Sequence, residues 1–310
     1  MIVINDTQTI PPQGLAATIG FFDGVHLGHR FLIDELKRTA AARNLPSAVI
    51  TFPEHPRTVL HSDYQPKLLN SFEEKIELLG GTGIDYGIVL PFTPELSRLS
   101  AQAFIEEVVS RRYGVKALLT GYDHRFGHNR TDGFEQYTAY GKACGVEVLR
   151  APAFDAGRIR VSSSEIRAQL AARNIWQANE FLTYPYRIKG TIIAGNQIGR
   201  TIGFPTANIR VDEPFKVIPG IGIYAVRVAV DGEKYPGMLY IGDRPTLSND
   251  NAISMEVNIL NFSGNLYNRE IEVFFEEYIR DNRKFGSLDE LKQQLTRDRE
   301  QVLSLLANPA

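Results

Sequence analysis

Short apolar runs alternate with amphipathic segments through the first half of the chain. Five of these runs have the length of buried strands and lie at 15–19, 47–52, 84–90, 115–120 and 146–149. Between them, apolar residues recur at helical spacing, which predicts helices in the segments 31–40, 71–79, 101–112 and 134–143. Strands that alternate with helices predict a parallel sheet, and ligands bind such sheets at the carboxyl ends of the strands.

We interpret residues 184–186 as a linker, because the spacing of the hydrophobic residues changes beyond them. Short strands separated by turns follow at 187–194, 221–230, 235–241, 254–261 and 270–279, and such spacing predicts a small antiparallel β-barrel. Ser287 and Glu290 predict the cap of a terminal helix whose packing face contains Leu288, Leu291, Leu295 and Val302. We therefore expect an α/β chain of two domains, 1–183 with the parallel sheet and 184–310 with the barrel and a terminal helix.

Composition narrows the class of protein. The chain has 310 residues, 43% of them hydrophobic and 23% charged, which suits a soluble globular protein of two domains. A formal net charge of -2 gives no support for nucleic-acid binding. The single Cys144 excludes an internal disulfide and fits a reducing compartment. With no signal-peptide pattern and no run near the roughly 18 apolar residues of a membrane span, we expect a cytoplasmic protein without a membrane partner.

The first predicted strand runs into a glycine-rich turn with two histidines. The turn and the helix start behind it contain Gly20, Phe21, Asp23, Gly24, His26, Gly28 and His29. Such a turn directs backbone N–H groups and the positive end of a helix dipole at one place, which suits a phosphate, and imidazoles add hydrogen bonds and charge. No Gly-Lys-Ser/Thr follows, so the segment is not a P-loop. The residues alone also fit a loop with two surface histidines, whereas a zinc site is disfavoured in a chain with one cysteine.

Two more predicted strands also end in polar loops. Residues 53–57 carry His55 and Arg57, and residues 121–127 carry Asp123, His124 and Arg125. Because the carboxyl ends of parallel strands meet at one edge of a sheet, we expect these loops to lie beside the glycine-rich turn.

A serine run opens the helix that follows residue 161. Ser163 and Ser164 precede Arg167 by one turn or less. Hydroxyl groups and a guanidinium at this spacing can converge on the β- and γ-phosphates of a nucleotide. A serine run at a helix start is otherwise an ordinary cap.

The first loop of the predicted barrel spans 195–208 and is rich in glycine. Gly195, Gly199 and Gly203 permit close approach of the backbone to phosphate oxygens. Thr206 and Asn208 offer oxygen ligands of the kind that Mg²⁺ takes beside nucleotide phosphates. A flexible glycine hairpin explains the glycines but not the Pro-Thr-Ala-Asn behind them.

One carboxylate stands out on a barrel strand. In the strand 254–261, alternation places Met255, Val257 and Ile259 toward the core and Glu256 on the other face. On this pattern alone Glu256 is a solvated side chain.

Several of these segments match family signatures. The turn Gly-x-Phe-Asp-Gly-Val-His-x-Gly-His resembles the nucleotidyltransferase superfamily, and within it the flavin adenylyltransferase branch. The serine run at 162–167 is similar to that branch's Ser-Ser-Thr-x-Ile-Arg, with Ser164 in place of threonine. The loops at 51–57 and 121–127 resemble two further signatures, with Pro53 and Glu54 exchanged and with His124 in place of an aromatic residue.

The second half resembles a different enzyme. Gly-Arg-x-x-Gly-Phe-Pro-Thr-Ala-Asn at 199–208 is similar to the riboflavin kinase signature, and 219–224 and 241–246 also look like segments of that enzyme. Over nearly its whole length the chain thus resembles the bifunctional bacterial riboflavin kinase/FAD synthetase family.

This resemblance implies a Rossmann-like nucleotidyltransferase domain followed by a kinase barrel. It implies riboflavin, FMN and ATP as small-molecule substrates, Mg²⁺ as cofactor and FAD as product. Glu256 would be the catalytic base of riboflavin phosphorylation, while Asn258 stands where the family often has histidine. His26, His29 and Arg167 would carry adenylyl transfer, in which ATP is cleaved and pyrophosphate released.

The resemblance also implies the ligand-binding residues. In the transferase, ATP would contact Gly20, Phe21, Asp23, Gly24, His26, Gly28, His29, Ser163, Ser164 and Arg167. The flavin there would contact His55, Arg57, Asp123 and Arg125. In the kinase, ATP would contact Gly195, Gly199, Arg200, Gly203, Thr206 and Asn208, the last two holding the metal, and the flavin would lie near Arg280.

Two other functions stay open at this stage. The first half could adenylylate another phosphorylated acceptor, such as nicotinamide mononucleotide or phosphopantetheine. Alternatively, the chain could be a non-catalytic flavin-binding carrier or sensor. In either case the sequence predicts a monomer or a weak homo-oligomer.

Overall fold

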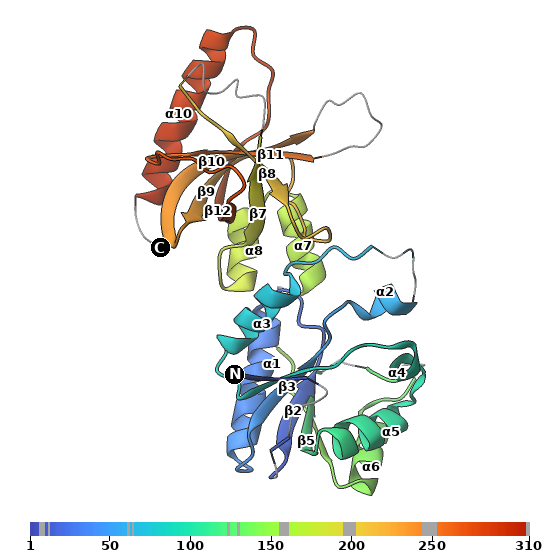
Figure 1. Ribbon diagram of the computed structural model, residues 1–310. Helices are drawn as coiled ribbons and strands as arrows, with labels where there is room; N and C mark the ends of the chain where they lie inside the picture. Colours follow the sequence, from blue (N-terminus) through green and yellow to red (C-terminus); the bar gives the residue numbers. More distant parts are fainter. Residues whose placement is uncertain are drawn as a thin grey trace. The chain divides into compact units, whose positions relative to one another are not determined.

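The computed structural model describes residues 1–5, 10–11, 13–60, 63, 65–122, 125–128, 131–154, 161–194, 203–243 and 253–307. The chain divides into two compact units, Met1–Ser163 and Ser164–Ala310 (Figure 1). The first unit contains a parallel sheet and the second a closed antiparallel barrel, which confirms the predicted fold class. The domain boundary predicted after residue 183 separates two functions. The division into compact units does not test it, so it stays a prediction.

The first unit is built on a six-stranded parallel sheet with the order β1-β4-β3-β2-β5-β6. Its strands are β1 (Ile2–Ile4), β2 (Leu15–Ile19), β3 (Ser47–Thr51), β4 (Tyr86–Val89), β5 (Val115–Thr120) and β6 (Glu147–Arg150). From β2 the chain moves outward through β3 and β4, and then returns to place β5 on the other side of β2. The strand order therefore reverses between β2 and β5, where open α/β sheets bind their ligands.

Helices connect these strands. They are α1 (Leu27–Ala41), α2 (Pro56–Leu60), α3 (Phe72–Gly80), α4 (Pro94–Arg98), α5 (Ala101–Ala103), the π-helix η1 (Phe104–Arg112) and α6 (Phe134–Ala143). Helix α3 begins with the predicted capping box, in which Glu74 N donates to Ser71 Oγ at 3.2 Å and Ser71 N donates to Glu74 Oε2 at 2.9 Å. The helix predicted over 101–112 is wound mainly as a π-helix, a form that sequence periodicity does not distinguish.

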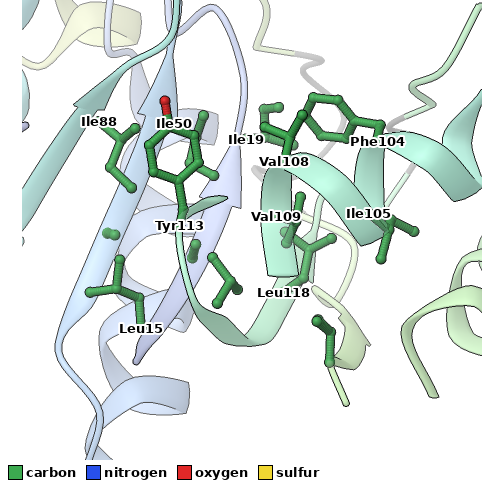
Figure 2. Packing of buried hydrophobic residues seen from close by; sticks show 14 of the residues in the cluster. Leu15, Ile19, Ile50, Ile88, Phe104, Ile105, Val108, Val109, Tyr113 and Leu118 are labelled. Carbon is green, nitrogen blue, oxygen red and sulfur yellow. The ribbon is translucent and has the colours of Figure 1, made fainter. Parts of the chain in front are cut away.

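Both faces of the sheet are buried. Leu15, Ile19 and Ile50 pack on one face against η1, as Figure 2 shows. The neighbouring Ala16 and Val49 point to the other face, where they pack against α1. This two-sided burial explains why the strands are continuous apolar runs and not alternating ones.

The second unit is organised round the closed barrel β10-β11-β8-β7-β12-β9. Its strands are β7 (Arg187–Ile193), β8 (Ala207–Val211), β9 (Gly222–Val230), β10 (Glu233–Asp243), β11 (Ile253–Ile259) and β12 (Glu270–Arg280), and its helices are α7 (Ser163–Ala171), α8 (Ile175–Leu182) and α10 (Leu288–Leu306). Helix α7 begins at the last residue of the first unit. The strand β8 lies where the sequence indicated only the end of a loop.

Helix α10 packs on the barrel (Figure 1). Val302 is fully buried with Phe204 and Met238, and Leu295 is partly buried against the same cluster. The predicted packing role of Leu288 is wrong, because its side chain is 61% exposed at the first residue of the helix. The packing face is made by the later turns of α10.

Candidate active sites

The glycine-rich turn joins β2 to α1 and is held in an unusual conformation. Phe22, Gly24 and Val25 have positive φ angles of 56°, 86° and 37°. A positive φ costs a glycine little, but it is uncommon for a residue with a Cβ and strained for a β-branched one such as valine. Phe22 and Val25 are both buried, so packing beneath the turn keeps the backbone in place.

Side chains from neighbouring segments anchor this turn. Leu69 N donates to the Asp23 carboxylate at 2.8 Å, and Gly24 N donates to the side-chain oxygen of Asn70 at 2.8 Å. Ser163 Oγ donates to the Asp23 carbonyl at 2.8 Å. The Asp23 carboxylate is thus engaged in holding the turn.

The two histidines lie together at the start of α1. His26 is the residue before the helix and is 5% exposed, and its ring stacks on that of His29 with centroids 3.7 Å apart and planes at 17°. The His29 ring also contacts Phe22 at 5.0 Å. A Cβ at Gly28 would lie 3.3 Å from the His26 ring and crowd it, whereas glycine leaves room for the ring. Both imidazoles therefore lie beside the N-terminal amides of α1, where an anion is stabilised.

The loop after β3 meets the turn as predicted. The His55 ring packs edge-on against Phe21 with centroids 4.8 Å apart, and His55 Nδ1 accepts a hydrogen bond from Arg57 N at 3.1 Å. The Arg57 side chain is exposed. This contact confirms that the loops after β2 and β3 lie side by side.

The remaining predicted residues of this site are placed only in part. Arg125 borders a cavity of about 450 Å³ beyond β5, and Asp123 and His124 lie outside the described residues. Ser164 and Arg167 contact each other through Nη2 and Oγ at 3.3 Å, and both belong to the second unit. Their convergence on the turn stays a prediction.

The barrel unit places three predicted residues together. Thr206 Oγ1 donates to Glu256 Oε2 at 3.2 Å, and Asn208 on β8 is the cross-strand partner of Glu256 on β11. Ser254 Oγ donates to the other carboxylate oxygen of Glu256 at 3.4 Å. Of the predicted glycine-loop residues, Gly203 is described and has a φ of 84°, whereas Gly195, Gly199 and Arg200 lie outside the described residues.

A cavity of about 670 Å³ borders Glu256 and Thr206. Its other walls combine apolar or aromatic side chains, among them Phe204, Ile223, Met238, Tyr240 and Phe285, with charged ones such as Asp243, Arg283 and Lys284. The volume is typical of small-molecule sites, which combine apolar walls with a few polar groups. Arg280 also borders this cavity, where its guanidinium donates to the buried Asp298 carboxylate with Nη2–Oδ2 at 2.7 Å.

Comparisons with known proteins identify the family of the chain. Residues 9–165 match the family described as FAD synthetase, and residues 182–306 match the family described as riboflavin kinase. The bifunctional riboflavin kinase/FMN adenylyltransferase of Escherichia coli (strain K12) is 38% identical over 296 residues, which are 95% of this chain and 94% of that protein. The protein of the same name from Haemophilus influenzae is 39% identical over 287 residues, 92% of either chain.

The chain belongs to the bifunctional riboflavin kinase/FMN adenylyltransferase family. The FMN adenylyltransferase precedes the riboflavin kinase, in the order that the sequence predicted. We call Met1–Ser163 the adenylyltransferase unit and Ser164–Ala310 the kinase unit, after the family that matches most of each. The FAD synthetase match extends beyond Ser163 to residue 165, and the functional boundary predicted after residue 183 leaves Ser164 and Arg167 with the adenylyltransferase.

A solved structure shares this fold over almost the whole chain. It is named a macrolide-efflux protein, from Streptococcus pneumoniae, and is 29% identical with a TM-score of 0.87, covering 97% of this chain and 98% of its own. Among the described residues of our chain, no helix has the length and apolar character needed to cross a membrane.

The kinase unit offers hard oxygen donors for Mg²⁺. The described residues contain no cluster of three or more His, Cys, Asp or Glu side chains that could hold a metal by themselves. Mg²⁺ at nucleotide sites usually takes one or two protein oxygens, with phosphates and water completing the shell. The Thr206 hydroxyl, the Asn208 amide and the nearby Glu256 carboxylate fit that requirement.

Three residues near the sites make contacts to which the sequence analysis gave no role. Lys75 on α3 is buried behind the glycine-rich turn, and its Nζ donates to the Phe52 carbonyl at 2.6 Å. Asn258 is buried in the kinase unit and donates to the Pro205 carbonyl at 2.6 Å.

Tyr240 is the third such residue. It lies directly opposite Glu256 in the β10–β11 pair, and burial followed by the Glu256 charge raises the pKa of its hydroxyl. Lysine and tyrosine are common on ordinary helices and strands, so only their contacts distinguish Lys75 and Tyr240.

Proposed function

We propose that the kinase unit transfers the γ-phosphoryl group of ATP to the 5′-hydroxyl of riboflavin at Glu256. The Glu256 carboxylate accepts the hydroxyl proton, the oxygen forms a bond to the γ-phosphorus, and ADP leaves. The cavity beside Glu256 binds the flavin ring against its apolar and aromatic walls, with Arg280 at its border. The hydrogen bond between Thr206 and Glu256 at the edge of this cavity, with Asn208 as the cross-strand partner of Glu256, is the observation that carries the proposal.

Thr206 and Asn208 would hold Mg²⁺ together with the nucleotide. When bound there, the ion would offset the negative charge of the phosphates. The glycine loop, including Gly195, Gly199, Arg200 and Gly203, would cover the phosphates through its backbone N–H groups.

We further propose that the adenylyltransferase unit joins FMN to the α-phosphorus of a second ATP. An FMN phosphate oxygen forms the new bond, the bond to the β-phosphate oxygen breaks, and pyrophosphate leaves with its electron pair. No protein nucleophile is required, so positioning and charge stabilisation carry the rate. The stacked His26 and His29 at the start of α1 support this role.

The other predicted residues complete that site in our proposal. Gly20, Phe21, Asp23, Gly24 and Gly28 shape the phosphate-binding turn, and Ser163, Ser164 and Arg167 bind the leaving pyrophosphate. The flavin end is formed by His55, Arg57, Asp123 and Arg125.

A time course of the purified chain with riboflavin, ATP and Mg²⁺ tests both steps. Chromatography should detect FMN first and FAD later, and chelation of Mg²⁺ should stop both products. FMN without FAD, also from supplied FMN, would contradict the second step and point to another phosphorylated acceptor. Bound riboflavin without any product would contradict both steps and favour a flavin carrier.

Oligomeric state and location remain sequence-based predictions. We expect a cytoplasmic monomer or weak homo-oligomer with no nucleic-acid partner. Light scattering coupled to size-exclusion chromatography measures the mass, and a stable tetramer or larger assembly would contradict this expectation.

A further inference from the structure

Lys75 is a buried cation behind the phosphate-binding turn. The side chain extends from α3 and is only 2% exposed. Its Nζ donates to the Phe52 carbonyl at 2.6 Å and lies 4.1 Å from the centroid of the Phe21 ring. An ammonium over an aromatic face is attracted by the ring, most of all where water is excluded.

The surroundings of Lys75 set its charge. Burial lowers the pKa of Lys75 to about 8, and the Asp23 carboxylate opposes this shift. Asp23 is the acidic group of the turn that acts on Lys75, and it also accepts the hydrogen bond from Leu69 N. On α3 itself, the neighbouring Glu74 carboxylate accepts from Ser71 N in the helix cap.

Lys75 connects the two loops of the adenylyltransferase site. Phe52 directly precedes the loop that carries His55, and Phe21 belongs to the turn before His26. The Phe21 ring contacts the Lys75 ammonium and also the edge of the His55 ring. A contact chain thus runs from Lys75 through Phe21 to His55.

Packing alone does not account for a lysine at this position. Burying an ammonium is costly unless its interactions offset the loss of water, and an apolar side chain of similar length fills such a space without that cost. A methionine could not donate a hydrogen bond to the Phe52 carbonyl, and it carries no charge to attract the Phe21 ring or the Asp23 carboxylate.

We propose that Lys75 is a positioning residue for adenylyl transfer, which fixes Phe21 and the end of β3 and thereby holds His55 beside the phosphate-binding turn. This inference rests on the proposed function of the turn. Lys75 acts through its neighbours and touches no reacting atom in this role. Its charge adds positive potential where the ATP phosphates bind.

Lys75→Met tests the proposal, because it keeps the length of the side chain and removes the charge. We expect kcat for FAD formation from supplied FMN to fall by about 100-fold, as expected for a small displacement of reacting groups. Riboflavin phosphorylation should stay within about twofold and shows that the chain is intact. Lys75→Arg keeps a cation and should recover at least part of kcat.

Lys37→Met is the matched control in the same unit. Lys37 Nζ also donates to a backbone carbonyl, that of Thr82 at 2.9 Å, but its side chain is substantially exposed on α1. Both activities of this variant should match those of the unmodified chain. Full adenylyl transfer in Lys75→Met, or equal losses in Lys37→Met and Lys75→Met, would overturn the proposal.

The pH profiles of the unmodified chain and of Lys75→Arg supply a readout that a role in packing alone would not produce. We expect kcat for adenylyl transfer to decline above about pH 8 as Lys75 loses its proton, and Lys75→Arg to move this decline to higher pH. The other titratable groups around Lys75 are Asp23, Glu74 and His55. The shift of the decline in Lys75→Arg is what assigns this limb to Lys75. A flat profile to pH 10 would overturn the proposal.

His29→Ala separates failure of this inference from failure of the proposed function. If His29→Ala loses adenylyl transfer while Lys75→Met retains it, only the inference about Lys75 is wrong. If His29→Ala retains adenylyl transfer, the assignment of the turn is wrong and the inference falls with it.

Discussion

The Thr206 hydroxyl donates a hydrogen bond to the Glu256 carboxylate, with Oγ1 and Oε2 3.2 Å apart. Thr206 directly precedes β8 and Glu256 lies on β11, so the contact depends on the pairing of these two strands. The group proposed to accept a proton is therefore adjacent to a group proposed to hold Mg·ATP. Both groups lie in the kinase unit, so mutation of either should leave adenylyl transfer intact.

Glu256→Gln should remove riboflavin phosphorylation and spare FAD formation. The amide keeps the size of the side chain but cannot act as a base at neutral pH, so we expect FMN production to fall by at least about 100-fold. FAD formation from supplied FMN should stay within about twofold. Chromatography of the flavins measures FMN production and FAD formation. Glu233→Gln, on β10, is the control variant. Equal loss of the two activities would contradict the division of labour.

His29→Ala should have the opposite effect. Loss of one group that stabilises transition-state charge commonly costs about 100-fold or more in kcat, so adenylyl transfer should fall by that amount while FMN formation continues. His128→Ala alters an exposed histidine of the same unit and should leave both rates unchanged. Unaffected adenylyl transfer in His29→Ala would remove His29 from the site.

Asn258 should support Thr206 through the backbone. It donates to the carbonyl of Pro205, the residue before Thr206, and is 6% exposed. Asn258→Leu leaves this carbonyl without its donor, and we expect a loss of about 1–3 kcal/mol of stability and a raised KM for ATP in the kinase reaction. Asn258→His offers a ring N–H and should show smaller changes. A loss of stability with an unchanged KM would show a purely structural role.

Gly242 and Tyr240 should be energetically coupled. A Cβ built on Gly242 would overlap the phenol of Tyr240, which borders the proposed riboflavin cavity. Gly242→Ala should therefore displace this ring and raise KM for riboflavin. In a Tyr240→Ala background the same substitution should have little further effect, which a double-mutant cycle measures. Additive effects would show that the two positions act independently.

Lys75 should make the stability of the chain depend on alkaline pH. The pKa of this group is lowered to about 8 in the folded state, so between pH 8 and the ordinary lysine pKa the unfolded chain binds a proton that the folded chain does not. As the pH rises through this window, Lys75 therefore increases the free energy of unfolding by up to about 3 kcal/mol. Denaturant unfolding of the unmodified chain and Lys75→Met across pH 7–10 measures the difference. A constant difference would contradict the lowered pKa.

Much of the fold could be predicted because parallel strands constrain one another. Apolar runs that alternate with helices predict a parallel sheet, whose strands end at one edge. The turn after β2 and the loop after β3 therefore meet there, as the contact of Phe21 with His55 shows. The barrel followed from short alternating strands. Strand β8 was missed because its residues overlap the end of a glycine-rich loop, whose motif dominated the pattern.

The roles of residues that depend on contacts distant in the sequence could not be predicted. Lys75 has the sequence context of an exposed lysine on an amphipathic helix, and only the fold brings Phe52 and Phe21 to its ammonium. Asn258 likewise depends on a carbonyl 53 positions away in the chain. Leu288 fits the helical spacing of the packing face but lies at the exposed start of α10.

The left-handed backbone at Phe22 and Val25 has a consequence for heat inactivation. Holding two non-glycine residues in this region costs about 1–3 kcal/mol each, and the core beneath the turn supplies that free energy. The turn should therefore relax before the sheet melts. Adenylyl transfer would then fail several degrees below the unfolding temperature of its unit, and a mutation deep in the sheet could silence it in a chain that still looks folded.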